Sequence, residues 1–101
     1  MNKGYAEEKT EMKAKKGFVL RNIAGDNVLM PTDENITRFN GVLLMNEAAA
    51  FVWEKLNSSI SRQELLTAIL DEYEIDEETA SPDLDVLLEK LKNHDVIDID
   101  D

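Results

Sequence analysis

Short apolar segments separated by turn residues in the first half of the chain predict an antiparallel sheet. Ala24-Gly25-Asp26-Asn27 is rich in turn-forming residues, and Asn40-Gly41 favours a type I′ hairpin. We therefore expect an N-terminal antiparallel sheet of three to four strands, which cover residues 18–23, 28–30, 36–39 and 42–45.

The last of these strands, Val42 to Met45, is apolar at four successive positions. Side chains alternate across a strand, so Leu43 and Met45 share one face, and Val42 and Leu44 share the other. If Leu43 and Met45 enter the core, Val42 and Leu44 need a cover. That cover is either another part of this chain or an extended peptide that adds to the edge of the sheet.

After this strand the apolar residues recur with the spacing of amphipathic helices. Asn46 is a suitable N-cap for a first helix, which carries Trp53, the only tryptophan and a predicted core residue. Ser61 and Glu64 have the spacing of a capping box and predict the start of a second helix.

A third helix is predicted over residues 83–93, with leucines at 84, 87, 88 and 91 facing the core. Proline deep inside a helix costs about 3 kcal/mol, so Pro82 favours a break between a short turn at 77–80 and this helix. Val96, Ile97 and Ile99 predict a short final strand or a docked tail.

The chain has 101 residues, which correspond to one domain, and 43% of them are hydrophobic. Residues 1–16 are polar and charged without periodicity, so we expect a flexible charged arm there and a folded domain over 17–101. No apolar run is long enough for a membrane span, and the N-terminus lacks a signal-peptide pattern. With no cysteine, these features favour a cytoplasmic protein without disulfides.

The net charge of −11 is unevenly distributed. Residues 1–16 hold five Lys and three Glu, a charge of +2, while residues 17–101 hold six Lys or Arg and nineteen Asp or Glu, a charge of −13. An acidic body repels phosphate backbones, because nucleic-acid affinity comes largely from Lys and Arg that replace counterions. We therefore expect no nucleic-acid partner.

The sequence offers no pattern of catalytic or metal-binding residues. It has no cysteine and no Gly-rich phosphate loop, and its one histidine, His94, lies among polar residues at a predicted helix end. The acidic run from Asp71 to Glu78 lacks the glycine and the alternating spacing of a calcium loop. We therefore expect a protein that is not an enzyme and has no metal or cofactor.

An ordered set of motifs covers residues 17–99. The strand and helix start Gly41-Val42-Leu43-Leu44-Met45-Asn46-Glu47 leads into Ala50-Phe51-Val52-Trp53-Glu54. Further motifs are Ser61-x-x-Glu64-Leu65, Tyr73-x-Ile75-Asp76, Leu84-x-x-Leu87-Leu88-x-x-Leu91 and Val96-Ile97. In this order they resemble PqqD-like proteins. The chain departs from that family at Met45, where Leu is usual, and at Asp95, where Gly is frequent.

The resemblance implies a winged helix-turn-helix-like α+β fold, in which a three-stranded sheet precedes three helices. It also implies a recognition element for ribosomally made, modified peptides. Such domains bind the leader of a precursor peptide by strand addition, between the last sheet strand and the third helix. They deliver the precursor to a modifying enzyme, often a radical S-adenosylmethionine enzyme. Carried over to this chain, the expected peptide-binding residues are Val42, Leu43, Leu44, Met45, Asp85, Leu88, Glu89 and Lys92.

Two other functions use the same elements. A winged-helix transcriptional regulator is one, although the acidic body disfavours DNA. The other is an adaptor that dimerises through Val42 and Leu44. The expected oligomeric state is a monomer or a weak homodimer. The sequence does not indicate whether the bound peptide belongs to the synthesis of coenzyme PQQ or of another product.

Overall fold

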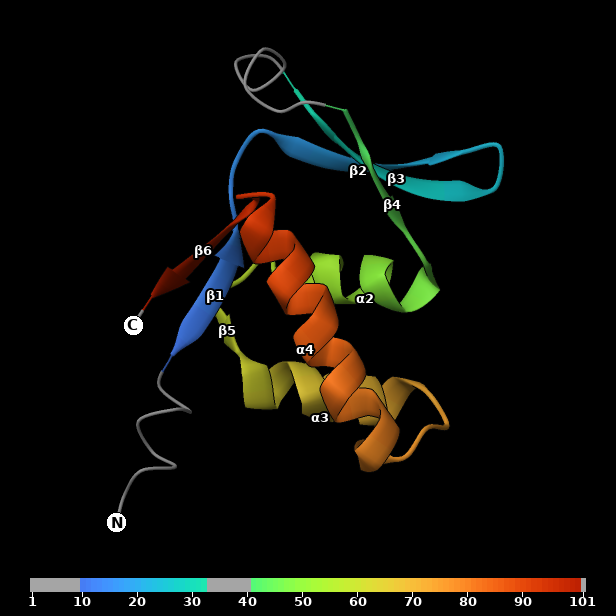
Figure 1. The fold of residues 1–101 in the computed structure, drawn as a ribbon, viewed down its shortest axis with the longest axis vertical. Helices are drawn as coiled ribbons and strands as arrows, with labels where there is room; N and C mark the ends of the chain where they lie inside the picture. The colour runs from blue at the N-terminus through green and yellow to red at the C-terminus, as the bar shows by residue number, and fades with distance from the viewer. Residues whose placement is uncertain (1–9, 33–40, 101) are drawn as a thin grey trace.

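Figure 1 shows the fold of the chain in a computed structural model, which describes residues 10–32 and 41–100. The described part is an α+β fold with two small antiparallel sheets and three helices, which confirms the predicted fold class, one N-terminal sheet and the three helices, while the second sheet was not predicted. In chain order the elements are β1 (Glu11–Ala14), β2 (Phe18–Ile23), β3 (Asp26–Pro31), β4 (Leu43–Met45), α2 (Glu47–Lys55), β5 (Ile60–Ser61), α3 (Arg62–Glu72), α4 (Glu77–Asn93) and β6 (Ile97–Asp100).

The first sheet has the strand order β2-β3-β4 and confirms three of the predicted strands. Strands β2 and β3 meet in a two-residue turn at Ala24 and Gly25, both with positive φ, so β3 begins two residues earlier than expected. Gly41, which precedes β4, also has a positive φ of 93°. The predicted strand at 36–39 and Asn40 of the predicted hairpin lie outside the described residues.

The second sheet, of order β5-β1-β6, joins segments far apart in the sequence. Residues 11–14 form its central strand and pair with residues 97–100 on one side. The expectation of a flexible arm is therefore wrong for these residues, because Met12 is buried and the two neighbouring strands supply backbone partners. Residues 1–9, the rest of the expected arm, lie outside the described residues.

The predicted starts of the first two helices are confirmed. The Asn46 side chain accepts a hydrogen bond from the Ala49 N–H at 2.8 Å and caps α2. Before α3, the Ser61 hydroxyl accepts from the Glu64 N–H at 3.1 Å. The Glu64 carboxylate in turn accepts from the Ser61 N–H at 3.0 Å, which completes the capping box.

Helix α4 is continuous over 17 residues, so the expected break at Pro82 is wrong. Asp76 starts the helix by accepting from the Thr79 N–H at 3.1 Å. In the second turn, Pro82 deprives only the Glu78 carbonyl of its helical donor, and Glu78 is exposed, so water can supply the missing bond. One unmade backbone bond at an exposed position does not interrupt the helix.

The end of α4 is a Schellman motif. The Val96 N–H donates to the Leu91 carbonyl at 3.2 Å, and Asp95 takes the left-handed conformation with a φ of 60°. The chain then enters β6, which confirms the predicted final strand. Through the sharp turn at Asp95, α4 is tied directly to the second sheet.

One core joins both sheets to the three helices. Trp53 is 4% exposed, as the sequence predicted, and packs among buried residues of the first sheet and of α3 and α4. In Figure 1, α4 crosses α3 and α2, and the β2-β3-β4 sheet lies at the end of the molecule toward which α4 runs. No helix in the described ranges is long and apolar enough to span a bilayer.

Loss of the capping box is expected to weaken the fold. We predict that Ser61→Ala lowers the free energy of unfolding by about 1–2 kcal/mol, because the Glu64 N–H at the start of α3 loses its acceptor. The matched control Ser59→Ala, at an exposed position two residues earlier, should change it by less than about 0.5 kcal/mol. Urea unfolding of the wild type and the two variants measures both effects. Equal losses of stability in the two variants would contradict the capping role of Ser61.

Candidate functional site

Strand β4 forms an edge of the first sheet. Within residues 10–32 and 41–100 it pairs with β3 alone. Leu43 and Met45 are buried under the sheet, whereas Val42 and Leu44 are 51% and 64% exposed. The predicted division of the two faces is thus confirmed. The described part of the chain leaves the second face uncovered.

The backbone of β4 presents hydrogen-bonding groups to this open side. The Lys90 ammonium donates to the Leu44 carbonyl at 3.3 Å from α4, so this carbonyl points away from β3. In an antiparallel strand the N–H and C=O of one residue point the same way and alternate along the strand. Leu44 therefore offers both groups outward, while Leu43 and Met45 direct theirs to Leu29 and Asn27 of β3.

A groove of about 710 Å³ lies between the end of β4 and the helices. Three alanines, Ala48, Ala49 and Ala80, leave room in it that longer side chains would fill. Most of its lining is apolar, which suits burial of a ligand's hydrophobic side chain. The remaining lining residues are Asp26, Asn27, Leu44, Met45, Asn46, Val52, Ile69, Ile75, Asp83, Leu84, Val86, Leu87 and Lys90.

The structure brings only part of the predicted site together. Leu44 and Met45 line the groove, whereas Leu43 lies beneath the sheet and Val42 on the open face. The helix residues expected to join them do not line the groove; these are Asp85, Leu88, Glu89 and Lys92. The groove therefore lies along a different face of α4 from the one that the resemblance indicated.

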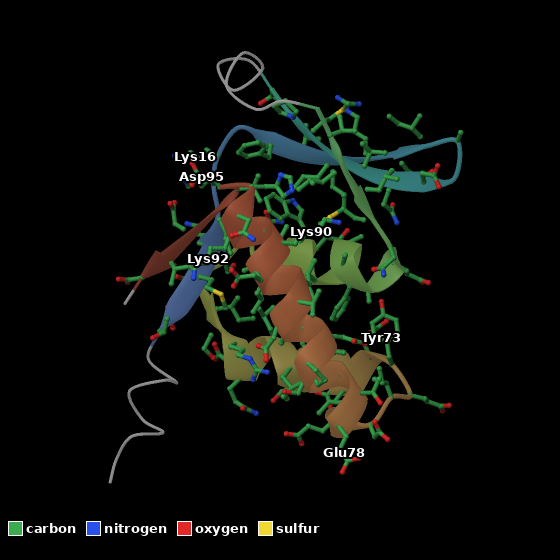
Figure 2. The ribbon with its side chains drawn as sticks, in the orientation of Figure 1. Lys16, Tyr73, Glu78, Lys90, Lys92 and Asp95 are labelled. Atoms are coloured by element: carbon green, nitrogen blue, oxygen red, sulfur yellow. The ribbon has the colours of Figure 1, made fainter. Side chains whose placement is uncertain are left out.

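The contacts of α4 explain this difference. Asp85 faces α3, where its carboxylate accepts from the Arg62 Nε at 2.6 Å. Leu88 packs against the core. Figure 2 shows Lys90 on the side of α4 toward β4 and Lys92 on the side toward β1 and β6.

The residues of α4 that do line the groove follow helical spacing, i, i+3, i+4 and i+7, and could have been found as one mixed stripe. They are Ala80, Asp83, Leu84, Val86, Leu87 and Lys90, and the spacing repeats from Ala80 to Leu87 and from Asp83 to Lys90.

An aromatic contact joins α2 to the end of α3 beside the groove. The rings of Phe51 and Tyr73 meet edge to face with centroids 5.6 Å apart, and the Lys55 ammonium lies 5.1 Å from the Phe51 ring centroid. Burial of the phenol, followed by the negative charges of Glu47, Glu72 and Glu54, raises the pKa of Tyr73. The phenol therefore stays neutral above the pH at which a free tyrosine ionises.

The described residues contain no group of three or more acidic, His or Cys side chains placed to hold a metal ion. The arrangement is that of a binding surface: an open strand edge, an apolar groove beside it and one lysine between them. These features define a class of small α+β domain in which the last strand of a sheet lies open beside a long helix.

The family model described as Coenzyme PQQ synthesis protein D (PqqD) matches residues 26–97. The chain therefore belongs to the PqqD family. A solved structure of TbiB1 in complex with the TbiA(beta) leader peptide has a similar fold, with a TM-score of 0.67 at 22% sequence identity. The match covers 85% of this chain and 94% of that one. A search of curated proteins found no match.

The alternation along β4 predicts a pattern of amide exchange. We expect the Leu44 amide to exchange with solvent deuterium much faster than those of Leu43 and Met45, because only the latter two donate to β3. Residue-resolved exchange followed by NMR measures the three rates. Protection of Leu44 equal to that of its neighbours would mean that the edge of β4 is occupied.

The raised pKa of Tyr73 predicts a loss of stability in alkali. The neutral phenol is favoured in the folded state, so this contribution is complete below pH 10 and is lost as the pH rises through the folded-state pKa. Absorbance titration of a Tyr5→Phe variant, which leaves Tyr73 as the only tyrosine, should show a midpoint above 10. Tyr73→Phe should remove this part of the loss of stability at alkaline pH. A titration midpoint at the ordinary value of a free tyrosine would contradict the raised pKa of Tyr73.

Proposed function

We propose that this protein recognises the leader of a ribosomally made precursor peptide by strand addition to β4. The observation that carries the proposal is the pair of outward backbone groups of Leu44 beside an apolar groove. An extended peptide placed along β4 would exchange backbone hydrogen bonds with Leu44 and extend the β2-β3-β4 sheet by one strand.

The groove supplies the second part of the recognition. Because side chains of an added strand alternate, every second residue of the peptide would face the molecule and the others solvent. A large apolar side chain at such a position would enter the space above Ala48 and Ala80, against Leu87 of α4. The backbone bonds hold a peptide of any sequence, and the groove adds the preference for particular side chains.

Two comparisons support this proposal. Membership of the PqqD family, and the similarity in fold to TbiB1, which was solved with a leader peptide, agree with a peptide ligand. We further propose that the domain is non-catalytic, needs no cofactor and acts in the cytoplasm. Its second partner would be a peptide-modifying enzyme, such as a radical S-adenosylmethionine enzyme, that makes coenzyme PQQ or another modified peptide.

A titration tests the proposal directly. The probes are synthetic peptides translated from the N-terminal parts of short reading frames beside the gene. Isotope-labelled protein is titrated with each, and backbone signals are followed by NMR. The proposal predicts shifts in Val42 to Met45 and in the residues that line the groove. If peptides bind but shift signals only elsewhere, strand addition to β4 is wrong.

Proline scanning of β4 separates binding from folding. Leu44→Pro removes an N–H that faces outward, so the sheet keeps its ladder while the peptide loses a donor. We expect the free energy of peptide binding to become less favourable by about 1–3 kcal/mol, because one backbone carbonyl of the peptide is left without a donor. The control Leu43→Pro removes a donor to β3 and a buried side chain, so it should unfold the domain instead. Thermal unfolding and peptide titration distinguish the two outcomes.

Filling the groove is an independent test. Ala48 lines the groove and is otherwise exposed, so Ala48→Leu should change the free energy of unfolding by less than about 0.5 kcal/mol. Peptide affinity should fall by about tenfold, or 1.4 kcal/mol. Thr67→Leu, at an exposed position of α3 outside the groove, is the matched control and should leave the affinity unchanged. Equal affinities for all three proteins would exclude this part of the groove.

Self-association is a second candidate function, because the exposed Val42 and Leu44 could pair with the same strand of a second copy. Such a dimer would occupy the edge that the peptide needs. Sedimentation at two protein concentrations, with and without peptide, decides between them. A dimer that peptide does not dissociate would favour the adaptor.

A further inference from the structure

We propose that Lys90 makes the β4 edge selective for peptides that carry a carboxylate side chain near the residue paired with Leu44. The inference deepens the proposed function and rests on it. Its starting point is the 3.3 Å hydrogen bond from the Lys90 ammonium to the Leu44 carbonyl, between residues 46 positions apart in the chain. A side chain of α4 thus already occupies the acceptor that an added strand would use.

Lys90 is the single positively charged residue among those that line the groove. The charged residues of this lining are Asp26, Asp83 and Lys90 alone. Among the described residues, no carboxylate lies within ion-pair distance of Lys90, in contrast to Lys15 and Arg62. An ammonium has three donors, and the Leu44 carbonyl uses one, so the other two face solvent or a ligand.

An added strand would compete with this contact. Its own N–H must donate to the Leu44 carbonyl, so the Lys90 ammonium either shares that oxygen or moves aside on its flexible stem. In either case it stays beside the peptide residue that faces Leu44. A carboxylate there offers a charge-assisted hydrogen bond that is stronger than the one to a carbonyl, and a neutral amide of the same shape does not.

The same contact disfavours a second copy of this chain as the occupant. Lysine at a strand edge is a common protection against pairing with another edge. A β4 strand from a second copy would bring its own Lys90 to the shared edge, and neither ammonium would gain a carboxylate from β4, which is apolar throughout. An acidic peptide satisfies the ammonium that a second copy leaves unpaired.

The experiment uses peptides selected from a display library of random linear sequences on the wild-type protein. Binders that shift the NMR signals of Val42 to Met45 are synthesised in pairs, in which each Asp or Glu is replaced by Asn or Gln. The affinity of each pair is measured for the wild type, Lys90→Met and Lys92→Met. Lys92→Met is the matched control, because it removes the same charge from the same helix on the side away from β4.

We expect the wild type to bind one acidic member about two- to fivefold more tightly than its neutral counterpart, the range of an exposed ion pair. Lys92→Met should keep this preference, and higher salt should reduce it. Lys90→Met should lose it and bind the neutral member at least as tightly as the wild type. Lys90→Gln, followed by its thermal unfolding curve, replaces Lys90→Met if that variant is poorly folded.

Two results overturn the inference while the proposed function stands. One is docking on β4 by peptides that have no acidic residue or show equal affinity within each pair. The other is a preference that survives in both Lys90 variants. If no selected peptide shifts the signals of β4, the proposed function fails and this inference with it.

Discussion

The antiparallel pairing of β4 with β3 is the constraint on which the rest of the site depends. The core takes up Leu43 and Met45, and the alternation of a strand then commits Leu44 to the opposite side. The backbone alternates with the same period, so the N–H and C=O of Leu44 are directed away from β3. A slip of one residue would bury Val42 and Leu44 and expose the present core residues, which makes the register costly to change.

The groove stays open because α4 is held by other parts of the molecule and not by β4. Near its start, Arg62 of α3 donates to the Ser81 hydroxyl at 2.7 Å and to the Asp85 carboxylate. After its end, the Val96 carbonyl accepts from the Lys15 N–H at 2.9 Å, which ties the chain to the segment after β1. Exposed ion pairs contribute little alone, but buried leucines of α4 hold the same geometry. Between these points, α4 reaches β4 through the Lys90 side chain.

Structural features that depend on local sequence patterns could be predicted from the sequence. Features that depend on contacts between residues far apart in the chain could not. The faces of β4 and the cap at Ser61 follow from spacing alone, and both are found in the structure. Strand β1 has a single buried residue, Met12, and exists because residues 60–61 and 97–100 lie beside it, which no local pattern reveals. The four leucines of α4 predict its buried face, but they do not show which flanking residues face α3 and which face β4; in the structure Asp85 lies toward α3, where it contacts Arg62.

Strand addition by itself leaves the register of a peptide unspecified, because backbone hydrogen bonds are the same at each residue pair and a shift by two residues restores them. In the proposed complex, two features along β4 would remove this ambiguity. The groove has space for a side chain beside Ala48 and Ala80, and Lys90 holds a positive charge beside Leu44. The net charge of −11 acts on a peptide at a distance, yet salt screens it over about 8–10 Å. At contact the local cation would outweigh this screened field, which makes the proposed preference for an acidic side chain compatible with an acidic protein.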